Sequence, residues 1–321
     1  MQVYHFCKVG GQKYNEGMTI KIFRIHPDGN ILIPNLASSL DLVTGSLPQG
    51  FYTTFSTLAH GTRVLGLQAH LDRLYHPAKE LNLCPTVNES VLRQRVAEIV
   101  KGNLPHESRV RLILAKDSGE IFVLVQHFKS LPESVYNDGV HVITSTVERH
   151  DPRIKGTDFI AQSAEQRKLV GKDVFEILLA HNGKILEGMT SNFYGIIYPV
   201  IAIRQAKQSS STERRLLRAE EHRPRNDGMI VTAQKGILLG VTRRAVLKIA
   251  RGQGMSIEYR SPLINEKFDE AFLTSSSRGV VPIVSIDDLP VGQGRVGVWA
   301  KTLLKAYQAY VRERSEIIIL I

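Results

Sequence analysis

Two stretches of the chain carry the residue types of a carbonyl-binding site. Lys155 ends the stretch 149-RHDPRIK-155, and Glu187 closes a strand-like run in 184-KILEGMTSNFYGII-197. A lysine attacks a carbonyl carbon only as the neutral amine, so a lysine whose pKa is lowered by burial is a candidate nucleophile. Each residue alone is more typical of a solvated surface, and the assignment therefore depends on what accompanies them.

Three further segments have the residue types that hold a phosphate. Proteins bind phosphate with backbone N–H groups at a helix N-terminus, with short hydroxyls and with a guanidinium. The chain offers an expected helix start, a run of hydroxyls and an arginine within an expected helix; these are Gly240-Val241-Thr242, Ser275-Ser276-Ser277 and Arg73.

One cofactor would use the whole set. An aldehyde takes the lysine, a protonatable pyridine nitrogen takes the carboxylate and keeps the ring an electron sink, and a phosphate takes the remaining groups. The set predicts pyridoxal 5′-phosphate. No metal site is expected, because Cys7 and Cys84 form no CxxC pair.

Five stretches, in this order, resemble the class IV (fold type IV) pyridoxal-phosphate family of branched-chain aminotransferases, D-amino acid aminotransferases and aminodeoxychorismate lyases. They are HLDRL (70–74), RHDPRIK (149–155), LEGMTSNFY (186–194), GVTRRAVL (240–247) and EAFLTSSSRGVVPI (270–283). The resemblance covers nearly everything from Met18 to about Tyr310. It implies two α+β domains with the cofactor in the cleft between them, and a homodimer.

The resemblance also implies a role for each matching residue. Lys155 would form the Schiff base, Glu187 would pair with the pyridine nitrogen, and Arg73 would bind the phosphate. The remaining phosphate ligands would be the backbone N–H groups of Val241 and Thr242, the Thr242 hydroxyl, and Ser276, which occupies the place of a usual threonine, with Ser275 and Ser277 beside it.

Other positions depart from the family pattern. The strand before HLDRL reads 51-FYTTFS-56, without the glutamate and arginine that the family's aminotransferases commonly carry. Phe159 and Ile160 stand where a tyrosine often bonds the cofactor's phenolic oxygen, and Asp158 replaces a usual asparagine. The cofactor-holding parts are therefore present, while the substrate-facing parts are altered.

The elements that must position these residues form an α+β pattern with mainly antiparallel sheets. Hairpins with turn residues outnumber strand–helix–strand units. We expect a small N-terminal domain, a linker and a large cofactor-binding domain with a basic loop insertion; these are residues 18–148, 149–154, 155–321 and about 199–228, after a probable extension at 1–17.

Composition limits the remaining choices. With 43% hydrophobic and 22% charged residues, the chain resembles an ordinary globular protein. No apolar run reaches the roughly 18 residues that span a bilayer, so we expect no membrane partner and a cytoplasmic location. The net charge of +10 suggests an anionic partner. Nucleic acid is the less favoured one, because the basic stretch 204–225 has no interleaved aromatic residues.

The predicted activity is an amino transfer. An amino acid, first an aliphatic or branched-chain L-amino acid, would donate its amino group to a 2-oxo acid such as 2-oxoglutarate, with Lys155 as base and acid. Candidates for binding the substrate carboxylate are Tyr52, Arg109, Arg111 and Arg278. Two activities of the same family stay open, D-amino acid transamination and elimination of pyruvate from aminodeoxychorismate. Outside that class, a non-catalytic nucleic-acid-binding protein would use the basic insertion.

Overall fold

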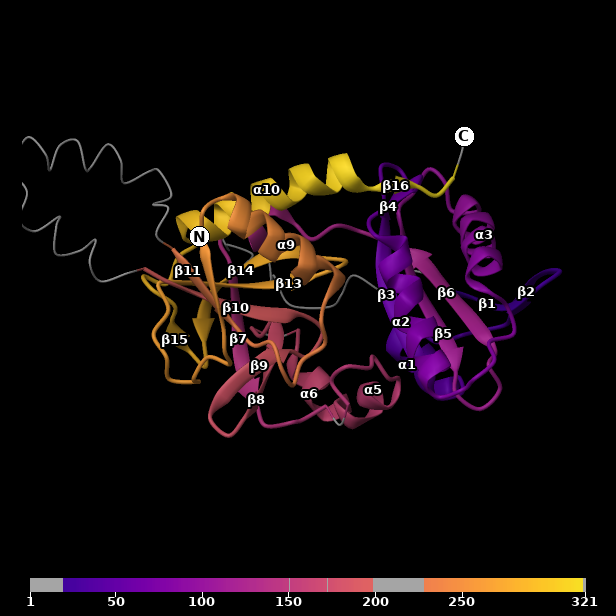
Figure 1. Ribbon diagram of the computed structural model, residues 1–321, viewed down its shortest axis with the longest axis horizontal. Coiled ribbons are helices and arrows are strands. Elements are labelled where there is room, and N and C mark those ends of the chain that lie inside the picture. The colour runs from indigo at the N-terminus through magenta and orange to yellow at the C-terminus, as the bar shows by residue number, and fades with distance from the viewer. Residues whose placement is uncertain (1–19, 150, 172, 199–227, 320–321) are drawn as a thin grey trace, which may run out of the picture.

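The structure is a computed structural model that describes residues 20–149, 151–171, 173–198 and 228–319. It has two lobes, each built on one sheet, with helices packed against the sheets (Figure 1). Most of the strand pairs are antiparallel, as the sequence pattern predicts. The basic stretch 204–225 and the extension at 1–17 lie outside the described residues. In the described part of the chain, no helix is both long and apolar enough to cross a membrane.

The small lobe contains a seven-stranded sheet in the order β16-β4-β3-β5-β6-β1-β2 within the described residues. Apolar side chains from one face of this sheet pack against α2 and α3, and the other face packs against α1 and α5. The elements are β1 (Lys21–His26), β2 (Gly29–Ile33), α1 (Leu40–Ser46), β3 (Gly50–Leu58), β4 (Arg63–Val64), α2 (Leu67–Glu80), α3 (Glu89–Lys101), β5 (Ser108–Ala115), β6 (Ile121–His127) and, from the C-terminal end of the chain, β16 (Glu316–Ile317).

The large lobe contains a nine-stranded sheet in the order β12-β11-β10-β13-β14-β7-β8-β9, with β15 paired to β14, among the residues described. Helices α9 and α10 bury Trp299, Leu303 and Val246 against it. The elements are α4 (Glu133–Asn137), β7 (Val140–Ser145), α5 (Asp158–Gln162), α6 (Ala164–Leu169), β8 (Glu176–His181), β9 (Lys184–Gly188), β10 (Asn192–Ile197), β11 (Met229–Thr232), α9 (Val241–Gly252), β12 (Ser256–Tyr259), β13 (Glu270–Ser275), β14 (Gly279–Ile286), β15 (Leu289–Pro290) and α10 (Val298–Arg314).

The division between the lobes differs from the expected boundary at 149–154. Strand β7, which the sequence analysis assigned to the small domain, pairs with β14 and β8 of the large sheet. The chain thus enters the large lobe before residue 140. Its C-terminal end returns, because β16 (Glu316–Ile317) pairs with β4 of the small lobe and Ile319 is buried in that lobe's core. Pairing between distant segments decides both points, and neither has a local sequence signal.

The returning end is anchored by polar contacts as well as by strand pairing. The Arg63 guanidinium donates to Ser315 Oγ, and Glu316 Oε1 accepts from the backbone N–H of Leu67 at 3.0 Å. Glu316 therefore caps the start of α2, whose own N-cap, Gly66, has no side chain to do so. Helix α10 and β16 run across the top of both lobes (Figure 1). This connection fixes α2 relative to the large lobe.

Candidate active site

Lys155 lies where the two lobes meet, and its backbone is tied to the small-lobe sheet. The Tyr52 N–H donates to the Lys155 carbonyl at 2.8 Å, and Phe51 of β3 forms an isolated antiparallel bridge with Gly156. Its Nζ lies 4.9 Å from the centre of the Tyr52 ring. Because β3 is a central strand of the small-lobe sheet, these contacts fix the position of the lysine backbone between the two lobes.

The surroundings of Lys155 favour the neutral amine. Burial, followed by the positive charges of Arg73, Arg149 and Arg111, lowers the pKa of the Lys155 ammonium well below its ordinary value, and Glu187 only partly opposes this. A lysine in this state can attack an aldehyde carbon. The structure thus supplies the condition that the sequence analysis required of a nucleophile.

Glu187 is buried at the end of β9, with 2% of its surface exposed. Its Oε1 accepts from Arg149 Nε at 3.2 Å, and its Oε2 accepts from the Leu238 N–H at 2.9 Å and from Asn192 Nδ2 at 3.5 Å. Burial raises the pKa of the Glu187 carboxyl to about 7, while Arg149 and the Leu238 N–H act in the opposite direction. A further cation bound beside this carboxylate would stabilise its ionised form.

The start of α9 approaches Glu187 closely. Asn192 Nδ2 also donates to the Leu238 carbonyl at 2.7 Å, which holds the preceding loop against β10. A Cβ at Gly240 would lie 2.3 Å from Asn192 Oδ1, so this position requires glycine. Glycine at the N-cap also leaves the first turn of α9 without a side-chain cap. Its N–H groups therefore remain available to a ligand.

Helix α2 brings Arg73 to the same place. The Arg73 guanidinium donates to the Leu239 carbonyl at 2.7 Å, directly before the start of α9. Burial lowers the pKa of Arg73 to about 10, so the side chain stays protonated at neutral pH. The structure thus brings an arginine and a helix N-terminus together across the two lobes.

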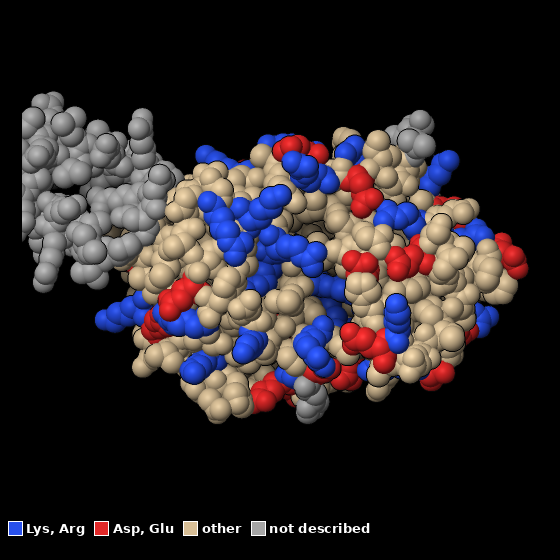
Figure 2. All heavy atoms as spheres, in the orientation of Figure 1, with Lys and Arg blue, Asp and Glu red and all other residues tan. Residues whose placement is uncertain are grey.

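A cavity of about 290 Å³ opens beside the α9 N-terminus and is lined by both lobes. Val241, Thr242, Ser276 and Ser277 line it from the large lobe, and His70 lines it from the small lobe. Figure 2 shows Lys and Arg side chains gathered around the hollow between the lobes. Four of the predicted phosphate positions therefore share one cavity, whose lining includes Arg278 and Arg312 but not Lys155, Glu187 or Arg73.

The arginines considered for the substrate differ in how the chain engages them. Arg111 donates to Asp41 of α1 at 2.8 Å, and Arg278 donates to the buried Glu176 at 2.7 Å and to Ser275 Oγ at 3.0 Å. Arg109 is different, because its buried Nε has no hydrogen-bond partner within the described part of the chain. Burial, followed by the charge of Arg111, lowers the pKa of Arg109 to about 10.

Comparison with known proteins decides the family. Residues 50–286 match the family described as "Amino-transferase class IV". The chain belongs to this family.

The similar relatives include branched-chain-amino-acid aminotransferases and D-alanine aminotransferases. The chain is 24% identical over 278 residues to a branched-chain-amino-acid aminotransferase of Pseudomonas aeruginosa, covering 80% of this chain and 81% of the relative. It is also 24% identical over 266 residues to a D-alanine aminotransferase of Bacillus licheniformis, covering 75% of this chain and 81% of the relative. The chain is therefore an enzyme, a class IV aminotransferase.

Solved structures share the fold. The branched-chain amino acid aminotransferase of Thermobaculum terrenum, in its PLP-form, superposes with a TM-score of 0.66 at 17% identity, covering 94% of this chain and 98% of that one. A putative branched-chain amino acid aminotransferase of Thermotoga maritima gives 0.65 at 22% identity, covering 91% and 96%. The predicted fold type IV, α+β with two domains, is confirmed.

Class IV aminotransferases depend on pyridoxal 5′-phosphate, and the residues in place fit it. Lys155 has a lowered pKa, as a partner for the aldehyde needs, and Glu187 is a buried carboxylate that a pyridinium would neutralise. The uncapped start of α9 and Arg73 supply donors for a phosphate. The cofactor predicted from the sequence is thus the cofactor of the family.

Sequence reasoning did not single out three polar residues of the candidate site. Arg149 and Asn192 contact Glu187, and buried His70 shares a 2.6 Å hydrogen bond with Thr53. Burial, followed by the charge of Arg73, lowers the pKa of His70 well below its ordinary value, so the imidazole is neutral. Each of the three residues lies within a motif quoted in the sequence analysis, RHDPRIK, LEGMTSNFY or HLDRL. Membership of these motifs was the sequence signal that could have identified them.

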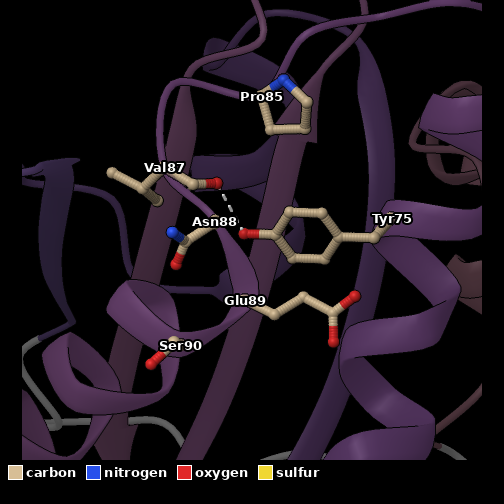
Figure 3. A pocket seen from close by; sticks show the side chains of 6 residues that line it. All are labelled: Tyr75, Pro85, Val87, Asn88, Glu89 and Ser90. Atoms are coloured by element: carbon tan, nitrogen blue, oxygen red, sulfur yellow. Dashed lines mark hydrogen bonds between the residues drawn. The ribbon is translucent and has the colours of Figure 1, made fainter.

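A second and larger cavity, of about 450 Å³, lies elsewhere on the small lobe. Tyr75, Val87 and Glu89 are among its lining residues, and the Tyr75 hydroxyl donates to the Val87 carbonyl (Figure 3). None of the predicted site residues lines it. Size alone therefore does not locate the active site of this aminotransferase.

Proposed function

We propose that this enzyme transfers the amino group of an aliphatic L-amino acid, first a branched-chain one, to a 2-oxo acid such as 2-oxoglutarate. The amino transfer is supported by one observation: Lys155, whose pKa is lowered, and the buried Glu187 lie near the same arginine, Arg149. The branched-chain substrate is supported by the names of several relatives and structural neighbours.

Each residue of the candidate site has a separate role in the proposed amino transfer. When bound, pyridoxal phosphate supplies an aldehyde for the amino group and a ring that accepts the electron pair released at Cα. Lys155, as a free amine, would move the proton between substrate Cα and the carbon that was the cofactor's aldehyde carbon, as base and then as acid. Glu187 holds the proton on the pyridine nitrogen. Arg73, Val241, Thr242 and the serines at 275–277 anchor the phosphate.

We assign the substrate carboxylate to Arg109. Arg111 and Arg278 are already paired with carboxylates of the chain, whereas the buried Arg109 Nε lacks a partner among the residues described. Its cross-strand neighbour Ser56 lines the cavity, and the Ser56 hydroxyl likewise has no partner there. A buried donor without a partner costs about 1–3 kcal/mol, which a ligand carboxylate would recover. Tyr52 remains the aromatic wall beside Lys155.

A kinetic comparison tests the Arg109 assignment. Losing a hydrogen bond to a charged group costs about 1.5–3 kcal/mol, so Arg109→Met should raise KM for amino acids roughly 10- to 150-fold. Arg24→Met, which removes a half-exposed arginine of β1 that pairs with Glu120, is the matched control and should leave KM unchanged. An unchanged KM in the Arg109 variant would assign the carboxylate to another group.

Absorption spectroscopy tests the amino transfer itself. With pyridoxal phosphate added, the protein should show a Schiff-base band that Lys155→Ala abolishes and that Lys79→Ala, at an exposed position of α2, leaves intact. L-leucine, L-glutamate and D-alanine are then added separately. Bleaching by L-leucine supports the proposal, whereas a band that none of them changes, with pyruvate released from aminodeoxychorismate, would point to a lyase. A protein without any band would refute amino transfer.

D-amino acid transamination is the second candidate. It is favoured by one specific finding, the D-alanine aminotransferase of Bacillus licheniformis at the same 24% identity as the branched-chain relative. Bleaching by D-alanine but not by L-leucine would establish it. The nucleic-acid alternative depends on residues 204–225, outside the described residues, and predicts salt-dependent binding that survives Lys155→Ala.

We also propose a homodimer. Several large apolar side chains of the small lobe are exposed in the single chain, including Leu32 of β2, Leu42 of α1, and Leu36 in the loop between these two elements. Such side chains gain from being covered by a second copy. Light scattering on the purified protein should give twice the chain mass of 35.9 kDa, and a monomer mass would contradict the proposal.

A further inference from the structure

Three groups fix how a pyridoxal ring can lie in the cleft. Lys155 must meet the aldehyde carbon, and Glu187 must meet the ring nitrogen, which stands opposite that carbon. Arg73 and the start of α9 must meet the phosphate, which leaves the ring on one of its two long edges. The other long edge carries the phenolic oxygen, and the residue facing it is therefore determined by elimination.

Arg149 is the candidate for that other edge. The Leu238 N–H, next to the phosphate groups, donates to Glu187 Oε2, whereas Arg149 Nε donates to Oε1 on the opposite side of the carboxylate. Arg149 also acts on the Lys155 pKa as the second-largest nearby charge, after Arg73. It thus contacts Glu187 directly and lies near enough to Lys155 for its charge to lower the Lys155 pKa.

The Arg149 guanidinium is fixed and still has a free donor. Its Nη2 donates to the Met189 carbonyl at 3.2 Å, and its central carbon lies 3.8 Å from the centre of the Phe159 ring. Only 6% of the side chain is exposed, yet buried Nη1 has no hydrogen-bond partner within the described residues. A guanidinium donor left unpaired in a protein interior is unfavourable, which points to an absent ligand atom as its partner.

We propose that Arg149 donates a hydrogen bond to the phenolic oxygen of the cofactor. The inference rests on the cofactor site described above and adds a residue that binds and tunes the cofactor. Phe159, four residues after Lys155, has no hydroxyl that could serve this oxygen, and its ring instead supports the arginine. A charge-assisted donor suits a phenolate, which is anionic and has lost its water.

The contact has a spectroscopic consequence. A cation beside the phenolate disfavours a proton on the nitrogen that joins Lys155 to the cofactor, because the two positive charges repel each other. Arg149→Met should therefore raise the pH midpoint of the cofactor's visible absorption change by about one to two units. Arg149→Lys, which keeps the charge, should move the midpoint less.

A binding cycle separates this contact from the contact with Glu187. The dissociation constant is measured for wild type and Arg149→Met, each with pyridoxal phosphate and with an analogue that lacks the phenolic oxygen. We expect the variant to bind pyridoxal phosphate at least about tenfold more weakly, and to lose little or nothing in affinity for the analogue. Equal losses with both ligands would mean that Arg149 acts only through Glu187, and would overturn the proposal.

The outcomes remain distinguishable from those of the proposed function. Wild type that binds neither ligand would refute the cofactor site itself. Wild type that binds both, with equal losses in the variant, would refute only the role of Arg149. Circular dichroism checks the fold, and if Arg149→Met does not fold, Arg149→Lys is carried through the same cycle and should show a smaller coupling of the same sign.

Discussion

Replacing Glu187 by glutamine is expected to change how the stability of the cofactor-free protein depends on pH. The carboxyl is 2% exposed, and burial raises its pKa to about 7 from an ordinary value of 4.5. Folding therefore favours the protonated form. The resulting stabilisation is complete below the unfolded pKa and is lost as the pH rises through the folded pKa.

The size of the effect follows from the shift. Each unit of pKa difference corresponds to about 1.4 kcal/mol. For a pKa that rises from 4.5 in the unfolded chain to about 7 in the folded protein, the linkage relation predicts the pH dependence of the unfolding free energy. Between about pH 5 and pH 8, the unfolding free energy of wild type should fall by about 2.5 kcal/mol relative to that of the glutamine variant. Most of this loss occurs below about pH 7, since above the folded pKa the carboxylate is ionised in both states.

Denaturant unfolding at a series of pH values measures this difference. Glu80→Gln, at an exposed position of α2, is the matched control and should follow wild type. A saturating amount of pyridoxal phosphate should flatten the wild-type dependence, because the pyridinium adds a positive charge beside the carboxylate and keeps it ionised in the folded state. A difference between wild type and the Glu187 variant that stays constant with pH, or that grows in favour of wild type, would refute the reasoning.

Three further substitutions test how the site is supported. Thr53→Val removes the partner of His70 and should lower the unfolding free energy by about 1–3 kcal/mol, measured by denaturant unfolding. Glu316→Ala leaves the Leu67 N–H uncapped and should cost about 1 kcal/mol in the same assay. The Glu270 carboxylate accepts from two backbone N–H groups at the start of α10. Glu270→Gln replaces one acceptor oxygen by an NH2 group, which leaves one of these N–H groups without an acceptor, and should lower the melting temperature. An effect within error at any of these sites would show that water or a shifted side chain replaces the lost contact.

Much of the site could be predicted because its parts are local in sequence. Glu187 ends a strand, Val241 and Thr242 open a helix, and each arrangement is written within a few residues. The helix start needs a glycine and no capping side chain, which 240-GVT-242 shows directly. These features depend on backbone geometry, which short stretches of sequence determine well.

The remaining features depend on pairs that are distant in sequence. Asp41 of α1, a helix that the sequence analysis did not predict, pairs with Arg111, and this contact is one reason why we propose Arg109 instead. Glu176 does the same to Arg278. A carboxylate that pairs with an arginine some 70 or 100 residues away has no local pattern, so sequence alone left Arg109, Arg111 and Arg278 equivalent.

The excess of positive charge in the cleft serves two requirements at once. In the proposed site, Arg73 and Arg149 would attract an anionic cofactor, and burial together with the same two charges lowers the pKa of Lys155. Without them the ammonium would be more stable, and fewer molecules would hold the neutral amine that attacks an aldehyde. Replacing Arg73 by a neutral residue should therefore weaken phosphate binding and also slow covalent attachment at neutral pH. The second effect should disappear as the pH rises above the Lys155 pKa, whereas the first should not, and this difference separates the two roles of one arginine.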